Sequence, residues 1–374
     1  MYFRDHETPI SPTGSLSAQA QKKGAYVYTL GQPGSPAIIF STAERQAVQD
    51  LIDRDVHNEN ALSGTVFFRR HPRRRGAALS LNEKTEWIGI RDQLVRPLLA
   101  AVPKNILPRP CCMLGPSPAP FVDPSRLGAH KDPATEALGL IYTGGAGFMD
   151  LGHIRETCDL TEFLWTRLQG SGGVPTVIPT VQGEATITRP VPRERFAAVA
   201  QAIANDDALG HEIWSYNVHS PGGHNSSFSP EDLCSNFVGT VIARLAIGEG
   251  GAFARKVDAK LAAVLKGLRA QTLAETAKAF DKIKMKWVNF IDSSSFLNDD
   301  YLRRRNFTRR PFKVGHPSDA ITPSWIMAGF GDAETFYSYK NTAVRTIPKT
   351  NFAAEIQQIR TDAKARYGND FDKP

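Results

Sequence analysis

Two polar segments that contain histidine carry the residue types best suited to chemistry. The first spans residues 152–159 and combines His153 with a cysteine and carboxylates. The second spans residues 210–217 and contains His211 and Glu212. Imidazole, thiolate and carboxylate groups are the ligands that zinc takes in proteins, and they also form nucleophile–base pairs. The sequence therefore predicts a metal site or a nucleophilic site in the middle third of the chain.

A zinc-dependent hydrolase is the first function that these residues predict. The second segment departs from the HExxH pattern of zinc peptidases, because Ser215 stands where the second histidine would be needed. Ligands from separate segments can still complete a zinc site, with Glu212 as the general base that activates the attacking water. The predicted ligands are histidines of both segments and of the loop that follows: His153, His211 and one of His219 and His224.

A cysteine hydrolase is the alternative, with Cys158 as its nucleophile. A cysteine near a helix N-terminus can have a lowered pKa, and His211 or His219 would serve as the base. However, Cys158 is spaced with Ile154 and Leu168 along the apolar stripe of the predicted helix, which favours a buried structural thiol. The residues alone leave the metal site and the thiol site both open.

A non-catalytic binding protein is the third hypothesis. The chain has a formal net charge of +7, and arginines concentrate at residues 69–75, 303–305 and 309–310. Such clusters can dock an anionic partner. No RNP, zinc-finger or helix-turn-helix pattern accompanies them, so they predict no specific nucleic-acid partner. The pattern predicts no particular oligomeric state.

A strand, a glycine-rich turn and a helix are expected to position His153. Residues 137–142 have the pattern of a buried strand, and the turn at residues 143–147 is predicted to lead directly into the helix. On a straight helix Asp159 does not share the face of His153. We therefore expect Asp159 to orient a ligand or to pair with Arg155.

The second polar segment ends another predicted helix. Residues 175–189 alternate as a hairpin does, and a helix over residues 193–217 with a break near residues 205–206 follows. Ser229 is predicted as the N-cap of the next helix. Asp232, Asn236 and Gly239 share one face of that helix, and two polar groups and a glycine there predict a close approach to another helix or to the site.

A predominantly helical α+β fold with a few short strands accounts for this order of elements. The proline-rich stretch at residues 103–124 indicates a boundary. We expect a flexible N-terminal arm over residues 1–24, an N-terminal subdomain over residues 25–110, and a main helical body with the site over residues 111–374.

Composition restricts the class of protein. The 374 residues are 41% hydrophobic and 22% charged, which is typical of a folded domain. No apolar run is long enough to predict a transmembrane helix. Four cysteines do not make a disulfide scaffold. The N-terminal residues lack a secretory signal, so we expect a cytoplasmic protein or export by a route independent of a signal peptide.

A family resemblance rests on three stretches of the sequence. These are GHIRE at residues 152–156, the His211-Glu212 pair, and SSFSPEDLCSN at residues 226–236. They resemble a bacterial family catalogued as a domain of unknown function, over about residues 138–331. Many members carry lipoprotein signals, which implies a cell-envelope substrate such as peptidoglycan. A member without such a signal would suit a cytoplasmic protein, or a toxin-like effector that a specialised secretion machine exports.

Overall fold

The structure is a computed structural model of the chain. It describes the strand backbones at residues 2–5, 26–30, 37–40 and 67–68, and it describes residues 121–132, 135–217, 227–249, 251–288, 302–343 and 345–373. The chain divides into two compact units. One contains residues 1–104 and 343–345, and the other contains residues 105–342 and 346–374.

The smaller unit contains a four-stranded sheet with the order β3-β2-β1-β4. Its strands are β1 (Tyr2–Asp5), β2 (Tyr26–Leu30), β3 (Ala37–Phe40) and β4 (Phe67–Phe68). Strand β2 runs antiparallel to both β1 and β3, and β4 runs parallel to β1.

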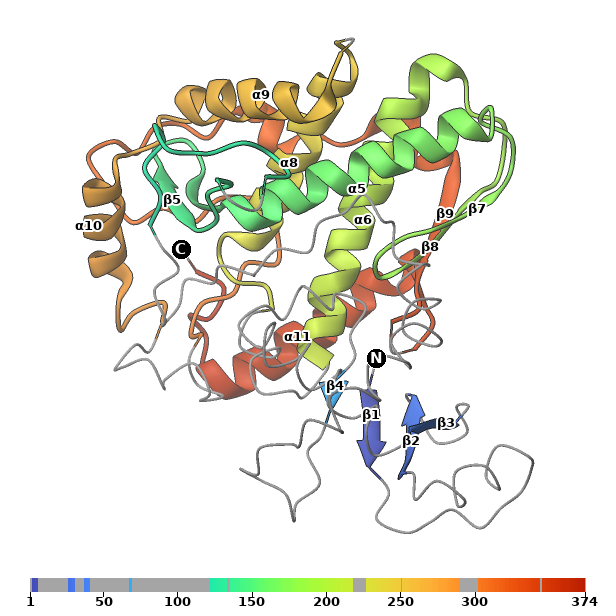
Figure 1. Cartoon of the computed structure of the whole chain (residues 1–374). Coiled ribbons are helices and arrows are strands. Elements are labelled where there is room, and N and C mark those ends of the chain that lie inside the picture. The colour runs from blue at the N-terminus through green and yellow to red at the C-terminus, as the bar shows by residue number, and fades with distance from the viewer. Residues whose placement is uncertain are drawn as a thin grey trace, which may run out of the picture. The chain divides into compact units, whose positions relative to one another are not determined.

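Three long helices form the centre of the larger unit: α5 (Leu151–Gly170), α6 (Phe196–Asn217) and α8 (Asp232–Ile247). Helix α5 packs against both others, and α6 also contacts α8 (Figure 1). A Cβ atom at Gly239 of α8 would lie 2.9 Å from the carbonyl carbon of Ile154 on α5. The close helix approach that Gly239 predicted is therefore confirmed.

A tight hairpin precedes α5. Strands β5 (Leu140–Thr143) and β6 (Gly147–Asp150) pair antiparallel, with Leu140 opposite Asp150. The prediction that the glycine-rich turn leads directly into the helix was wrong. The turn reverses the chain instead, and Gly147 has a φ of +69°, a conformation that glycine adopts without a Cβ penalty.

A second sheet covers part of the helical core. Strands β7 (Val177–Pro179), β8 (Gly183–Ile187), β9 (Tyr337–Asn341) and β10 (Ile347–Pro348) form an antiparallel sheet in the order β10-β9-β8-β7. Strands β7 and β8 are the two arms of the predicted hairpin, which is confirmed.

Helix α6 is continuous, so the predicted break near residues 205–206 was wrong. Two carboxylates at this point of the helix are buried and receive tyrosine hydroxyls from β9. Tyr337 donates to Asp206 at 2.5 Å, and Tyr339 donates to Asp207 at 2.7 Å. Partners on a distant strand thus satisfy polar groups that would otherwise favour a helix end.

Three further helices complete the described part of the larger unit: α9 (Phe253–Gly267), α10 (Leu273–Ile283) and α11 (Phe352–Tyr367). Short 3₁₀ turns link the elements: η3 (Arg193–Arg195), η5 (Ser324–Met327), η6 (Gly331–Thr335) and η7 (Lys349–Asn351). The predominantly helical α+β fold is confirmed (Figure 1). No helix among the described residues is both long enough and apolar enough to cross a membrane.

Buried apolar residues gather in three clusters. The largest joins α6 to the second sheet and α11, and it includes Ile203 and Tyr339. Another joins α5, α8 and α9 and includes Cys158 and Leu261. The last lies between the β5–β6 hairpin and α10 and includes Tyr142. Helices α5, α6 and α8 are therefore anchored on more than one side, which fixes the side chains at their ends.

Candidate functional site

His153, Glu212 and Asp232 come together from α5, α6 and α8. All three are buried. A ring nitrogen of the histidine and one oxygen of each carboxyl group all lie within 4.8 Å of one another. His153 Nε2 is 3.3 Å from Asp232 Oδ1. Within the described ranges, no other set of three His, Cys, Asp or Glu side chains is arranged closely enough to hold a metal ion.

The junction between β6 and α5 positions His153 in the first turn of its helix. Asp150 is the N-cap, and its Oδ1 accepts the backbone N–H of Gly152 at 2.6 Å. The other oxygen, Oδ2, lies 3.8 Å from His153 Nε2. The backbone N–H of Asp150 donates to Ser235 Oγ of α8 at 2.9 Å. The N-termini of α5 and α8 are therefore fastened to each other beside the site.

Two consecutive backbone amides hold the carboxylates. Phe228 N–H donates to Glu212 Oε2 at 2.7 Å, and Ser229 N–H donates to Asp232 Oδ2 at 2.7 Å. Phe228 has a φ of +55°, which is unusual for a residue with a large side chain. Its buried ring packs on Phe307 with the ring centroids 4.7 Å apart. Packing thus holds a strained backbone that aims both amides at the site.

The predicted N-cap role of Ser229 was wrong. Helix α8 begins at Asp232, and Glu231 stands at the cap position. The Ser229 hydroxyl donates to Glu231 Oε2 at 2.6 Å instead of accepting a helix amide. The carboxylate of Asp232 reaches back to the Ser229 N–H, which fixes the turn before the helix and caps no helix amide.

The turn before α8 is braced from the segment that follows residue 302. Asn306 N–H donates to the Phe228 carbonyl at 2.8 Å, and Asn306 Nδ2 donates to the Pro230 carbonyl at 3.1 Å. Arg305 Nη1 donates to the Ser227 carbonyl. Arg305 is fully buried and its guanidinium lies over the ring of Tyr216. This arginine therefore acts within the fold.

Burial dominates the electrostatics of the two carboxyl groups. Burial raises the pKa of Glu212 well above its usual value, and the charge of Asp232 raises it further. Burial raises the pKa of Asp232 to about 6, although the nearby charge of His153 opposes this shift. Two buried carboxylates side by side resist simultaneous ionisation unless positive charge is present. A proton or a metal ion can supply that charge.

One oxygen of each carboxylate receives no N–H or hydroxyl donor from other described residues, so only a proton held between the two carboxyl groups or a cation can satisfy it. These atoms are Glu212 Oε1 and Asp232 Oδ1. The approach of His153 Nε2 to Asp232 Oδ1 has the distance of an ion pair but lacks hydrogen-bond geometry. Buried acceptors are rarely left without a partner, because desolvation is costly. Two carboxylate oxygens and one imidazole nitrogen are a donor set that fits zinc or a similar divalent ion.

His211 lies beside this group and is not one of its three members. Its Nδ1 is 3.0 Å from Gln182 Nε2, in the turn between β7 and β8. Burial lowers the pKa of His211 to about 3, and the charge of His153 contributes to the shift. His211 is therefore neutral at physiological pH. Gln182 is held in turn by its own backbone N–H, which donates to the buried Asp207 at 3.0 Å.

The remaining residues predicted for the site are two histidines, a general base and a cysteine nucleophile. His219 and His224 lie outside the described residues. Glu212, predicted as the general base, brings a carboxylate oxygen into the group with His153 and Asp232, and its role as a base stays a prediction. Cys158 is fully buried, and its thiol donates to the Gly239 carbonyl at 3.1 Å. The apolar stripe predicted for α5 is confirmed, since Ile154, Cys158 and Leu168 have no exposed surface.

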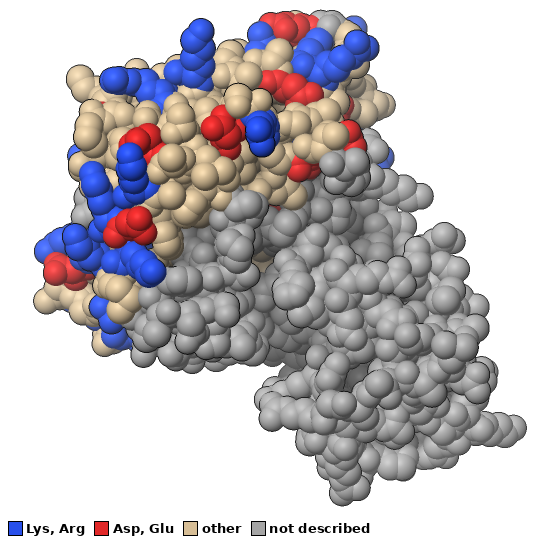
Figure 2. All heavy atoms as spheres, turned by 60° about the vertical axis from the view of Figure 1, so that its left-hand side comes forward, with Lys and Arg blue, Asp and Glu red and all other residues tan. Residues whose placement is uncertain are grey.

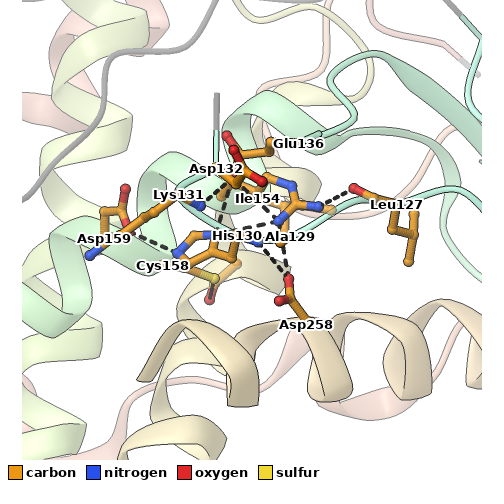
Figure 3. Close-up of polar contacts among 12 residues, drawn as sticks. Leu127, Ala129, His130, Lys131, Asp132, Glu136, Ile154, Cys158, Asp159 and Asp258 are labelled. Carbon is orange, nitrogen blue, oxygen red and sulfur yellow. Dashed lines mark hydrogen bonds and ion pairs between the residues drawn. The ribbon is translucent and has the colours of Figure 1, made fainter. Parts of the chain in front are cut away.

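Asp159 belongs to a separate buried polar network. Its Oδ1 lies 2.8 Å from His130 Nε2 and 3.2 Å from Lys131 Nζ. Figure 3 shows these side chains at α5 and the backbone of His130 facing Asp258 of α9, to which its N–H donates at 2.8 Å. Arg155 donates to the Leu127 carbonyl at 2.5 Å. The network fastens the segment before β5 to two helices.

Some arginines of the predicted clusters are buried in the fold, and others are exposed at the surface. Arg305 is buried, and the guanidinium of Arg309 lies 4.2 Å from the ring centroid of Phe237. Arg303 and Arg310 are exposed. Residues 69–75 lie outside the described part of the chain. Figure 2 shows basic side chains lying among acidic ones on the face that it displays.

Sequence reasoning did not identify Asp232 and Asp150 as site residues. Asp232 was placed on a helix face expected to approach another helix or the site but was not predicted as a ligand, and Asp150 was not considered. The sequence did contain a signal for Asp150. This residue lies three positions before His153, and that is where an N-cap carboxylate stands beside a histidine of the first helical turn. No local spacing could place Asp232 beside His153.

Comparisons with known proteins add a family but no activity. Residues 124–311 match the family described as "Protein of unknown function (DUF4056)", which covers half of the chain. All three site residues lie within this match. A search of curated proteins and a search of solved structures return no match.

Proposed function

The chain belongs to the DUF4056 family, and we propose that it is a hydrolase dependent on a divalent metal, with His153, Glu212 and Asp232 as ligands. The observation that carries the proposal is a pair of buried carboxylate oxygens that receive no N–H or hydroxyl donor from other described residues, in a group where His153 and both carboxyl groups each bring an atom within 4.8 Å of the others. A bound cation would neutralise both carboxylates and satisfy both oxygens.

Zinc is the metal that we propose. An imidazole with carboxylates is a donor set found in catalytic zinc sites, where positions left open by the protein take water or substrate. When bound, the metal would supply Lewis-acid chemistry for the hydrolysis of a polarised bond. His153 reaches the site from the first turn of α5, and Phe228 and Ser229 orient the two carboxylates through their amides. These hydrogen bonds would preorganise the ligands.

His211 is proposed to contact substrate rather than metal. Because the Nδ1 atom of His211 faces Gln182, that nitrogen is engaged. The ring is neutral at physiological pH, since its pKa is lowered to about 3. With Gln182 Nε2 donating to Nδ1, Nε2 carries the proton. A neutral imidazole N–H can donate a hydrogen bond to a developing negative charge.

Peptidoglycan is the substrate that we propose for the first assay. Its support is the resemblance to a family in which many members carry lipoprotein signals. Zinc-loaded protein would be incubated with purified peptidoglycan sacculi, and soluble fragments would be identified by mass spectrometry. Fragments that appear with the wild type and are absent with Asp232→Asn would support this substrate. Intact sacculi in both reactions would remove peptidoglycan as the substrate.

Metal binding is tested independently of any substrate. The full chain would be stripped with a chelator, reloaded with zinc, desalted and measured by elemental mass spectrometry. We expect about one zinc per chain for the wild type, and less than a tenth of that for His153→Ala and for Asp232→Asn, because each variant removes a ligand.

Asp159→Asn is the matched control. Asp159 is also a buried carboxylate paired with a histidine, at 2.8 Å, but it lies outside the three-residue group. Its replacement should cost stability and leave the zinc content unchanged. Equal zinc retention by the wild type and Asp232→Asn, or loss of zinc in Asp159→Asn alone, would contradict the proposed ligands.

A further inference from the structure

We propose that Ser318, His316 and Glu275 form a second catalytic site, a Ser-His-Glu triad for acyl transfer. His316 lies between the other two: Nδ1 is 2.7 Å from Ser318 Oγ, and Nε2 is 3.1 Å from Glu275 Oε2. A hydroxyl, an imidazole and a carboxylate in this order are the arrangement that activates a serine nucleophile. These residues are separate from the proposed metal ligands, so this inference does not depend on the metal.

The hydrogen bonds fix the tautomer of His316 in the direction that catalysis needs. The backbone N–H of Ser318 also points at His316 Nδ1, at 3.2 Å. A backbone N–H can only donate, so Nδ1 must carry the lone pair. The proton of the neutral ring then lies on Nε2, where it donates to Glu275. The Ser318 hydroxyl can therefore pass its proton to Nδ1 without a change of tautomer.

A buried tyrosine anchors the turn that carries the serine and the histidine. Tyr142 of β5 donates from its hydroxyl to Asp319 Oδ1 at 2.5 Å, and Asp319 Oδ2 accepts the His316 N–H at 2.9 Å. The rings of Tyr142 and His316 pack with their centroids 5.5 Å apart. Gly144 also approaches closely, since a Cβ atom there would lie 2.9 Å from the Ser318 carbonyl carbon. The triad thus rests on the buried hairpin.

The acid of the triad is held as a carboxylate. Glu275 lies in the first turn of α10, where its backbone N–H meets the N-cap Thr272 at 3.3 Å. Hydrogen bonds from Lys278 and then from His316 hold the pKa of Glu275 below its usual value. A carboxylate at this position can stabilise the imidazolium that forms when His316 accepts a proton.

The nucleophile is accessible while its base is protected. The His316 residue is 8% exposed. Ser318 is partly exposed, and the Glu275 side chain lies at the surface with 36% of it exposed. Apolar side chains are exposed close to the triad in sequence: Ile321 is 92% exposed and Leu273 is 48% exposed. We therefore expect a carboxylic ester with an apolar acyl chain as substrate.

The reaction balances with groups on this chain and water. Ser318 Oγ bonds to the ester carbonyl carbon as its proton moves to His316 Nδ1. The C–O bond to the alcohol then breaks, and the alcohol leaves with that proton. Water attacks the acyl-serine with His316 as base, which releases the acid and restores the hydroxyl.

Turnover should be slow, although labelling should be specific. The backbone N–H groups of Ser318, Asp319 and Ala320 already donate to His316 Nδ1, the His316 carbonyl and the Gly144 carbonyl. They are thus engaged elsewhere and cannot serve as oxyanion donors without rearrangement. A stoichiometric probe is therefore a more sensitive test than multiple turnover of an ester.

The test is reaction of the full chain with a biotinylated fluorophosphonate, followed by intact mass and peptide mapping. Attack by Ser318 Oγ displaces fluoride and leaves a phosphonylated serine. We expect one adduct, mapped to Ser318, in the presence and in the absence of a chelator. Glu275→Gln should lower the labelling rate at least tenfold, because general-base assistance contributes about 10²–10⁴-fold.

Two controls keep the result decisive. Ser324→Ala removes an exposed serine of the same segment and should label at the wild-type rate, whereas Ser318→Ala should not label. Peptide mapping of the wild type requires no variant to fold. No adduct on the wild type, an adduct on another residue, or equal rates for the wild type and Glu275→Gln would overturn the proposal.

Discussion

Replacement of Gly239 by alanine tests how closely α5 and α8 must pack. The new Cβ atom would lie 2.9 Å from the Ile154 carbonyl carbon, and closer still to the Ile154 oxygen and Thr157 Oγ1. Non-bonded carbon atoms rest about 3.5–4.0 Å apart, and the contact with the Ile154 oxygen is tighter than the carbon contact, so the two helices would have to separate by roughly 1 Å or more. The obstacle is helix backbone, which cannot rotate away as a side chain can.

The net effect on stability follows from two opposing contributions. Overpacking of a core costs about 1–3 kcal/mol, and a backbone clash belongs at the upper end of that range. Alanine in place of glycine in a helix returns about 1 kcal/mol. We therefore expect Gly239→Ala to lower the free energy of unfolding by about 2 kcal/mol.

Gly267→Ala is the matched control. Gly267 is the last residue of α9, and a Cβ atom there would meet nothing within 4 Å. This variant should be neutral or should gain up to about 1 kcal/mol. Urea unfolding would be followed by tryptophan fluorescence, since Trp165 and Trp214 lie on α5 and α6. A Gly239→Ala protein as stable as Gly267→Ala would refute the packing argument.

Three other predictions test buried charges. Burial raises the pKa of Asp206 to about 6. The native state therefore keeps a proton that the unfolded state releases near pH 4, and relative to Asp206→Asn the free energy of unfolding should fall by about 2 kcal/mol from pH 4 to 7. A rise over this range in urea titrations would contradict that sign. Glu212→Gln should stabilise the metal-free protein by about 1–3 kcal/mol by removing a buried repulsion. In saturating zinc the order of the melting temperatures should reverse, because ligand binding stabilises only the native state that holds the metal. Arg305→Ala should cost about 3 kcal/mol in urea unfolding, whereas Arg303→Ala at the surface should change stability by less than about 0.5 kcal/mol. Equal effects would assign both arginines to the surface.

Local patterns predicted the elements that carry the site. The apolar stripe through Ile154 and Cys158 placed α5 and its buried face. Gly239 predicted the close helix contact, because the absence of a side chain on a buried helix has few other causes. These features depend on the spacing of near neighbours, which a sequence records directly.

Partners that lie far apart in the chain could not be predicted. His153 meets Asp232 only because α5 and α8 pack together, and no spacing within either segment indicates this pairing. The polar residues around Asp206 suggested a break in the helix because the hydroxyl of Tyr337 lies 131 residues away. His316 and Glu275 are likewise brought together by the tertiary fold.

The chemical role of each site residue could not be predicted either, because it depends on partners that lie far apart in the chain. Glu212 was predicted as a base because it follows a histidine, yet its role depends on which groups face each oxygen. The Phe228 amide takes Oε2, and Oε1 is directed to no donor among the described residues. Only the tertiary structure distinguishes these two oxygens.

The most direct test of the metal site is anomalous diffraction from crystals of the full chain soaked in zinc, with data collected on both sides of the zinc absorption edge. We expect one strong difference peak at about 2.0–2.2 Å from a ring nitrogen of His153 and from carboxylate oxygens of Glu212 and Asp232. A peak at other residues, or none at these three side chains in zinc-soaked crystals, would contradict the central claim.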